Sequence, residues 1–266
     1  MEAISHAGTA IGILASQEGI VLAAERKMAS NLFESDQLSL RKIYPINQNS
    51  LLVAVAGITS DANMLVKYSR QVALKHESTF CSSLPTSRDQ PLYVPVEQFV
   101  HHICNLKQGY TQMGGLRPFG ASIIYAGYDD HFGFQLYQSD PSGNYAGWKA
   151  TAMGANTPAA QSILKNDYPE QSTDSSTFSL QQAQLLAIKV LKKTMETAHL
   201  KGESIEMSLL KRDSQKSRIV MKHLSSQEVD DLIKTFEESQ QGKEEEDSTD
   251  IKATASSQSL YSTTVS

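Results

Sequence analysis

Short apolar runs separated by turn-forming residues dominate the first part of the chain. Residues 9–24 contain two such runs, TAIGILA and IVLAA, on either side of SQEG, whose Glu-Gly pair suits a tight connection. Residues 42–56 repeat the arrangement, with KIYPI and LLVAVA around the polar sequence NQNS. The pattern predicts two β-hairpins, and therefore four strands before the first long helix.

After Gly57 the apolar residues follow the period of an amphipathic helix. One such segment begins behind a possible cap at Asp61, and a second begins behind Pro95. Residues 77–94, between them, are rich in Ser, Pro and charged side chains and show no sustained period. We expect two helices joined by a long exposed loop that is inserted into the domain.

Strand and helix signals alternate in groups through the second half. Strand patterns occur in three segments, residues 121–127, 132–137 and 146–152. Thr157-Pro158 predicts a helix start, because an oxygen cap is followed by Pro at the first helical position. Ser179-x-x-Gln182 and Ser225-x-x-Glu228 are capping-box sequences that predict two more helices, with a hairpin over residues 205–221 between them.

The predicted order is four strands, two helices, three strands, two helices, two strands and one helix. Because the helices come in pairs rather than one per strand, a doubly wound parallel sheet is disfavoured. We expect an α+β fold, with two antiparallel sheets between helical layers, as one domain over residues 1–238. Residues 239–266 are acidic and rich in Ser and Thr, and we expect a disordered tail there.

The charge distribution argues against nucleic-acid binding. The 266 residues include 24 Lys and Arg against 29 Asp and Glu, a formal net charge of -5, and no segment gathers the basic residues into a stripe.

The longest apolar run, LLVAVAGI, is too short to cross a bilayer, and the N-terminus lacks the pattern of a secretory signal. We expect a protein that binds neither nucleic acid nor membranes.

Few residues carry recognisable chemistry. The sequence has no phosphate loop, dinucleotide fingerprint, zinc-protease motif or nucleophile elbow. His101, His102 and Cys104 are close in sequence, but neighbours on a helix point in different directions, so we expect no metal and no cofactor. The two cysteines, Cys81 and Cys104, form no paired motif, which favours a reducing compartment, the cytoplasm or nucleus.

Thr9 follows Gly8 directly at the start of the first predicted strand. A threonine exposed as a new N-terminus can act as a nucleophile, with its own α-amine as the base. A threonine at this position is also explained by β-propensity alone. The residues leave both interpretations open.

Several long motifs resemble one known family. They are AGTAIGI, GIVLAAERK, RKIYPIN, AVAGITSDANML, YTQMGGLRPFGASIIYAG, GFQLYQSDPSGNYAGWKATAMGAN and AIKVLKKTM. In this order, from Met1 to about Phe236, they resemble the α-type subunits of the 20S proteasome. The resemblance implies the four-layer αββα sandwich of the N-terminal nucleophile hydrolases.

The same resemblance implies a function and a set of partners. It implies a non-catalytic structural subunit of the α ring that acts in ubiquitin-dependent protein degradation, substrate entry and activator docking. The implied partners are the other 20S α and β subunits, regulatory particles that dock through their C-terminal tails, and assembly chaperones. The implied location is the cytoplasm and nucleus.

The catalytic β subunits of the family attack with an N-terminal Thr, helped by Asp, Lys, Ser and a second Asp. Here Thr9 and Lys42 match, but the first Asp corresponds to Glu25 and the Ser corresponds to Ala155. Residues 197–200, where the family's second Asp is expected, contain no Asp. The comparison implies that Thr9 is a vestigial nucleophile position, because the proton-handling groups act as a unit. The alternative is a threonine peptidase formed by cleavage of the Gly8–Thr9 bond.

In α subunits the lysine that corresponds to Lys42 lines a pocket for the C-terminal carboxylate of activators. Ala7, Gly8 and Ile58 resemble the other walls of that pocket. Lys42 is equally explained as an ordinary salt-bridge partner. Relatives also carry a gate-forming tail and most of a helix ahead of the segment matching Met1, so a short α-like subunit that does not enter the ring is a third hypothesis.

Overall fold

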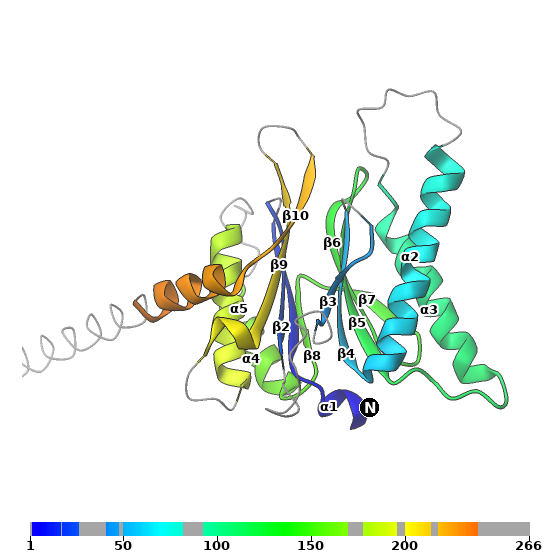
Figure 1. Cartoon of the computed structure of the whole chain (residues 1–266), viewed down its shortest axis with the longest axis horizontal. Coiled ribbons are helices and arrows are strands. Elements are labelled where there is room, and N and C mark those ends of the chain that lie inside the picture. Colours follow the sequence, from blue (N-terminus) through cyan, green and yellow to red (C-terminus); the bar gives the residue numbers. More distant parts are fainter. Residues whose placement is uncertain are drawn as a thin grey trace, which may run out of the picture.

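Two antiparallel sheets lie face to face, with helices on both outer surfaces (Figure 1). The computed structural model describes residues 2–16, 18–26, 41–47, 50–81, 93–169, 178–195, 200–213 and 218–238. Each sheet has five strands. This architecture is the expected α+β sandwich of αββα type.

Sheet A has the strand order β10-β9-β2-β1-β8. Its strands are β1 Ala10–Ala15, β2 Gly19–Glu25, β8 Ala150–Met153, β9 Ile205–Arg212 and β10 Ile219–His223. The first hairpin is confirmed, with Ala15 opposite Gly19. Ser16 adopts a left-handed φ of 42° at this turn, and a Cβ on Gly19 would overlap the backbone of Leu210, so the tight connection depends on glycine.

Sheet B has the strand order β3-β4-β5-β6-β7. Its strands are β3 Ile43–Pro45, β4 Leu51–Gly57, β5 Ala121–Asp129, β6 Gly133–Ser139 and β7 Tyr145–Gly147. The second predicted hairpin, β3–β4, is confirmed, and the strands expected over residues 121–127 and 132–137 form as β5 and β6, which pair with each other.

The single strand expected over residues 146–152 was wrong, because the chain crosses between the sheets there. The Trp148 amide donates to Leu136 in sheet B (2.9 Å), and the Lys149 carbonyl accepts from Leu14 in sheet A (2.8 Å). The apolar pattern continues across this crossing, so periodicity alone shows no break. The segment therefore forms β7 in one sheet and β8 in the other.

The helices cover the outer faces of the two sheets. Helices α2 (Thr59–Cys81) and α3 (Val96–Gln112) pack on sheet B, whereas α4 (Thr157–Asp167), α5 (Leu180–Thr194) and helical residues 226–238 lie beside sheet A (Figure 1). The short α1 (Glu2–Ser5) lies at one end of the sandwich, and a 3₁₀ turn, η1 (Gly202–Ser204), precedes β9. Buried apolar side chains fill three layers, one between the sheets and one under each helical face.

Local helix signals were right in two places and wrong in two. Both capping boxes form: Ser179 pairs with Gln182, and Ser225 pairs with Glu228. Asp61 is not the cap of α2, which begins two residues earlier; its carboxylate binds the Arg117 guanidinium (2.6 and 2.8 Å). Thr157 is not the cap of α4 either, because Asn156 holds that position in a left-handed conformation.

The expected loop over residues 77–94 begins later than predicted. Helix α2 continues through Cys81, so residues 77–81 are helical despite their polar composition. Residues 82–92 lie outside the described part of the chain, and so do residues 196–199 and the tail 239–266. Within the described residues, none of the helices is both long and apolar enough to cross a membrane.

Candidate functional site

One end of the space between the sheets gathers the residues singled out from the sequence. Thr9 directly precedes β1, Glu25 ends β2, Lys42 directly precedes β3, and Ala155 follows β8. Strand β1 pairs antiparallel with both β2 and β8, so Ala10 lies opposite Ala24 on one side and Met153 on the other. The antiparallel register thus brings segments that are far apart in sequence to one end of sheet A.

Thr9 is completely buried, and both of its polar hydrogens are engaged. Its amide donates to Oε2 of Glu25 (3.1 Å), and its hydroxyl donates to the carbonyl oxygen of Ala155 (2.8 Å). A carbonyl oxygen is too weak a base to take up the hydroxyl proton. With Gly8 attached, Thr9 has no α-amine, and its amide and hydroxyl link the start of β1 to Glu25 and Ala155.

The turn at Gly154–Ala155 packs directly on residues 7 and 8. The Ala155 amide donates to the Ala7 carbonyl (2.8 Å), and a Cβ on Gly154, which has a φ of 103°, would lie 2.6 Å from the Gly8 carbonyl oxygen. Ala155, which the resemblance matched to the family's serine, therefore lies beside Thr9 and carries only a methyl group. Of the other expected position, residues 197–200, only Leu200 lies within the described residues.

Lys42 and Gly8 come together at this site. A Cβ on Gly8 would overlap Nζ of Lys42 and would lie 3.0 Å from Oε2 of Glu25. The ammonium and the carboxylate therefore converge on the bare backbone of Gly8, which leaves room for them only because glycine has no side chain. Lys42 and Ala7 are both half-buried as residues, but Nζ of Lys42 itself is buried against the backbone of Gly8.

Ile58, the fourth predicted pocket residue, lies at the same end of sheet B. It follows β4, three residues after Val55, whose amide donates to the Lys42 carbonyl (2.9 Å). Its own amide donates to the Gly120 carbonyl (2.9 Å), and its side chain packs over Gly120. The side chain is 40% exposed. The structure thus brings Lys42 and Gly8 into contact and places Ile58 on the neighbouring strand end.

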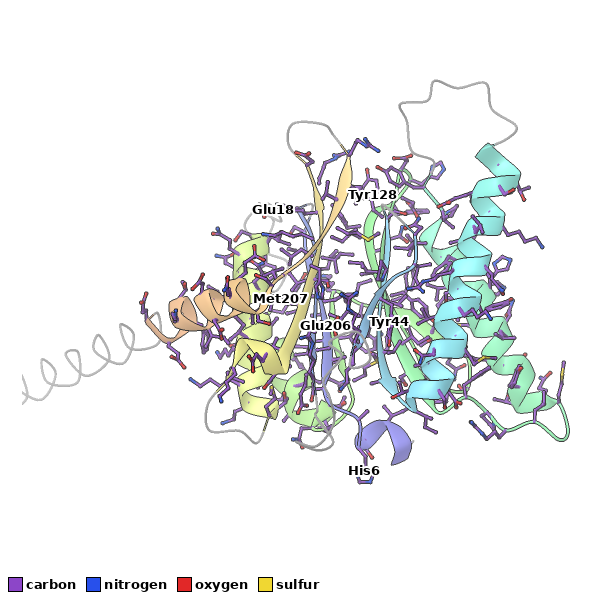
Figure 2. The ribbon with its side chains drawn as sticks, in the orientation of Figure 1. His6, Glu18, Tyr44, Tyr128, Glu206 and Met207 are labelled. Carbon is purple, nitrogen blue, oxygen red and sulfur yellow. The ribbon has the colours of Figure 1, made fainter. Side chains whose placement is uncertain are left out.

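The sequence interpretation missed Glu206, a buried carboxylate on β9. Its side chain points into the middle of the sandwich, where Figure 2 labels it together with Tyr44, and the residue is 1% exposed. Oε2 accepts a hydrogen bond from the Lys42 amide (2.8 Å) and lies 4.0 Å from Nε of Arg26. Burial raises the pKa of Glu206, and the bonded amides and nearby arginines oppose that rise. The only signal in the sequence is an acidic residue within the apolar run of β9.

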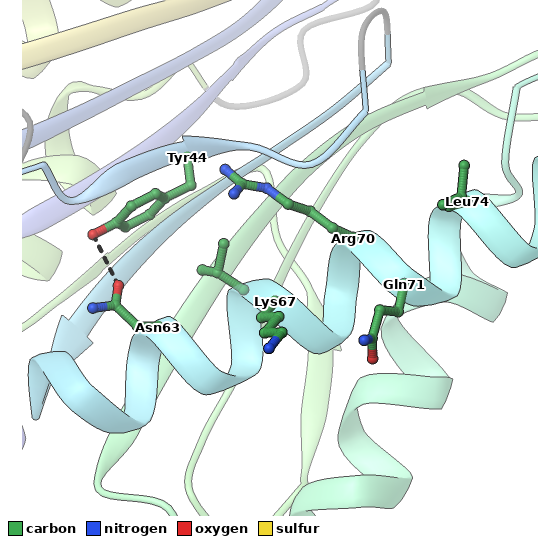
Figure 3. A pocket seen from close by; sticks show the side chains of 7 residues that line it. Tyr44, Asn63, Lys67, Arg70, Gln71 and Leu74 are labelled. Carbon is green, nitrogen blue, oxygen red and sulfur yellow. Dashed lines mark hydrogen bonds between the residues drawn. The ribbon is translucent and has the colours of Figure 1, made fainter.

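A shallow cavity of about 470 Å³ lies between β3 and α2 (Figure 3). The Tyr44 hydroxyl donates to the Arg41 carbonyl (2.7 Å) and approaches Oδ1 of Asn63 (3.4 Å). The Arg70 guanidinium donates twice to the Pro45 carbonyl. Burial, followed by the charge of Glu206, raises the pKa of Tyr44. These groups join the strand to the helix and offer no catalytic arrangement.

The histidines and cysteines show no convergence on a metal. Among the described residues, no three His, Cys, Asp or Glu side chains are grouped as a metal site would require. His101 and His102 are exposed on α3, and Nδ1 of His102 lies 2.7 Å from the Gln98 carbonyl oxygen. Cys104 is buried on the same helix.

Comparisons with known proteins converge on one family. A family model described as proteasome subunit matches residues 4–210. Probable proteasome subunit alpha type-3 of Schizosaccharomyces pombe is 42% identical over 240 residues, which is 90% of this chain and 89% of that protein. Proteasome subunit alpha type-3 of Saccharomyces cerevisiae is 43% identical over 252 residues, 95% of this chain and 90% of that protein. Proteasome subunit alpha type-4-A of Arabidopsis thaliana is 50% identical over 208 residues, 78% of this chain and 76% of that protein.

Proposed function

The chain belongs to the proteasome subunit family as an α-type member, and we propose that it serves the 20S core by closing the α ring and by docking activators. The α-type subunits are non-catalytic structural components of the core, and the β subunits carry the peptidase activity. The chain is accordingly a structural subunit for ubiquitin-dependent degradation that assembles with other proteasome subunits.

The hydrogen bonding of Thr9 supports this conclusion most directly. An active N-terminal threonine needs a free amine and a base for its hydroxyl proton. Here the amide of Thr9 is held by Glu25, and the hydroxyl is held by the Ala155 carbonyl. The former nucleophile position therefore ties β1 to the neighbouring strand ends.

The end of the sandwich around Lys42 is suited to an activator tail. A C-terminal carboxylate would receive a charge-assisted hydrogen bond from the Lys42 ammonium, beside the bare backbone of Gly8. Ala7 and Ile58 would form apolar walls on either side. We include substrate entry through the ring, contact with assembly chaperones, and a location in cytoplasm and nucleus in the same proposal.

Affinity purification of the chain, tagged at its native locus, tests this function. Size-exclusion chromatography followed by mass spectrometry should show the chain eluting with other α and β subunits, with the Gly8–Thr9 bond intact. Elution as a monomer or small oligomer, apart from complete proteasomes, would contradict the ring assignment and support the subunit that stays outside the ring. A chain that begins at Thr9 would support the peptidase instead.

A further inference from the structure

Glu206 joins the two sheets at the residue on which the docking proposal depends. It belongs to sheet A, and its carboxylate accepts the Lys42 amide of the segment that enters sheet B (2.8 Å). The nearby Ile43 amide opposes the rise in the pKa of this carboxylate. The Lys42 carbonyl in turn accepts from Val55 of β4 (2.9 Å). The backbone of Lys42 is therefore held by a side chain from one sheet and a strand from the other.

Burying a carboxylate is costly, and several groups offset the cost. Nε of Arg26 lies 4.0 Å from Oε2, and the charges of Arg26 and Arg41 favour the ionised form. Within the described residues Oε1 has no hydrogen-bond partner. In the described part of the chain, the direct hydrogen bond of Glu206 thus goes to the backbone at Lys42.

The register of β2 and β9 places Glu206 and Glu25 near opposite ends of the Lys42 side chain. Ala24 lies opposite Glu206, and Glu25 lies opposite Ile205. One strand pair therefore positions both Glu206, which holds the Lys42 backbone, and Glu25, whose Oε2 lies beside Gly8 with the Lys42 ammonium. The β2–β9 strand pair therefore positions groups at both ends of the Lys42 side chain, Glu206 at its backbone and Glu25 near its ammonium.

We propose that Glu206 is a positioning residue for the Lys42 docking site. It fixes the point at which the lysine side chain leaves the backbone, and so keeps Nζ against Gly8 without touching the ligand. A flexible lysine binds a carboxylate more tightly when its accessible conformations are limited before binding. This inference rests on the proposed docking function of Lys42.

The test measures binding of an activator tail to assembled 20S particles. The probe is a fluorescein-labelled peptide with the C-terminal sequence of a regulatory-particle subunit and a free carboxylate. Particles carrying Glu206→Ala should bind it about tenfold more weakly, and Lys42→Ala at least as weakly. The double variant should bind no more weakly than Lys42→Ala alone, because both substitutions remove one interaction.

Ser208 provides the matched control. It lies on the same face of β9 two residues along, is 4% exposed, and its hydroxyl is 2.7 Å from Nδ1 of His223. Ser208→Ala removes a buried polar group from the same strand but leaves the Lys42 amide bonded, so peptide affinity should stay at the wild-type value. If Glu206→Ala does not enter the particle, Glu206→Met is used under the same criteria, because it has a similar volume and offers the Lys42 amide no oxygen acceptor.

Two results would overturn the proposal. One is normal peptide affinity in the Glu206 variant when Lys42→Ala binds weakly. The other is a double variant whose loss equals the sum of the single losses, which would place the effect of Glu206 elsewhere. Normal affinity in Lys42→Ala would instead remove the docking function itself, so failure of the premise and failure of the inference give different results.

Discussion

Two lysines in this chain meet their surroundings in opposite ways. Lys107 on α3 is completely buried, and its ammonium donates to the Ala121 carbonyl (3.2 Å), the Ser139 hydroxyl (2.8 Å) and the Asp140 carbonyl (3.3 Å). Lys42 is half-buried, and its ammonium lies at the bare backbone of Gly8.

The contrast is between a cation that joins elements of the fold and one for which we propose a ligand. Three acceptors match the three protons of the Lys107 ammonium, so it joins α3 to β5 and to the end of β6. At Lys42 two contacts hold the backbone, through Glu206 and Val55, and the buried ammonium lies at the backbone of Gly8.

The largest expected effect is on stability, from Lys107→Met. The substitution leaves the buried Ser139 hydroxyl and two carbonyls without their donor, and we expect a loss of about 2–4 kcal/mol in the free energy of unfolding. Urea unfolding of the purified chain measures it. Lys234→Met, at an exposed lysine, is the control and should change stability by less than about 0.5 kcal/mol. A Lys107→Met variant as stable as wild type would contradict the claim that the Lys107 ammonium stabilises the fold.

The pH dependence of stability sharpens the same contrast. Burial lowers the pKa of Lys107 from 10.5 to about 8, with Cys104 and Asp140 opposing. Between about pH 8 and 10.5, Lys107 is protonated in the unfolded chain but not in the folded chain, so the free energy of unfolding rises with pH. This gain in stability is lost again as the pH falls through about 8. The slope is at most about 1.4 kcal/mol per pH unit. The stability difference between wild type and Lys107→Met should grow from about pH 8 to about pH 10, and a constant difference would contradict it.

Gly8→Ala tests the space at the Lys42 ammonium. The new methyl group would overlap Nζ, and the flexible end of the lysine would have to move away. We expect affinity for a C-terminal tail peptide to fall about tenfold in assembled particles, with little loss of stability. Gly114→Ala is a matched control, since no atom lies within 4 Å of a Cβ built there. Unchanged affinity in Gly8→Ala would argue that the ligand does not use this position.

The smallest effect is expected from an exposed ion pair. Glu228 binds Lys222 and the Ser225 amide, and these contacts lower its pKa from 4.5 to about 2. Its contribution is present above about pH 4.5 and is lost as pH falls toward 2. Glu228→Gln should shift the urea midpoint slightly at pH 7 and less at pH 3. A shift as large as that of Lys107→Met would mean that solvent exposure does not separate these groups.

Much of the fold could be predicted because its signals are local. Hairpin turns and the two capping boxes depend on residues a few positions apart, and these formed as expected. The β7–β8 crossing at Trp148 could not be predicted, because the choice of sheet depends on partners far along the chain. Asp61 was mistaken for a cap for the same reason, since its partner Arg117 is 56 positions away.

The candidate site divides in the same way. Thr9, Lys42 and Ala155 were picked out by their place in the family's motifs, and the structure brings all three to one end of the sandwich. Glu206 and Lys107 escaped notice because each is a charged residue within an apolar pattern, where the sequence shows a break but not the partner that makes it tolerable. Only tertiary contacts identify which charge supports a site and which supports the core.

The most direct test of the Lys42 assignment compares two forms of one tail peptide on assembled 20S particles, one with a free C-terminal carboxylate and one amidated. Wild-type particles should bind the free acid at least about tenfold more tightly than the amide, because only the acid forms the charged contact. Particles carrying Lys42→Gln should bind both forms alike. A Lys42→Gln particle that keeps the full preference for the free acid would contradict the assignment.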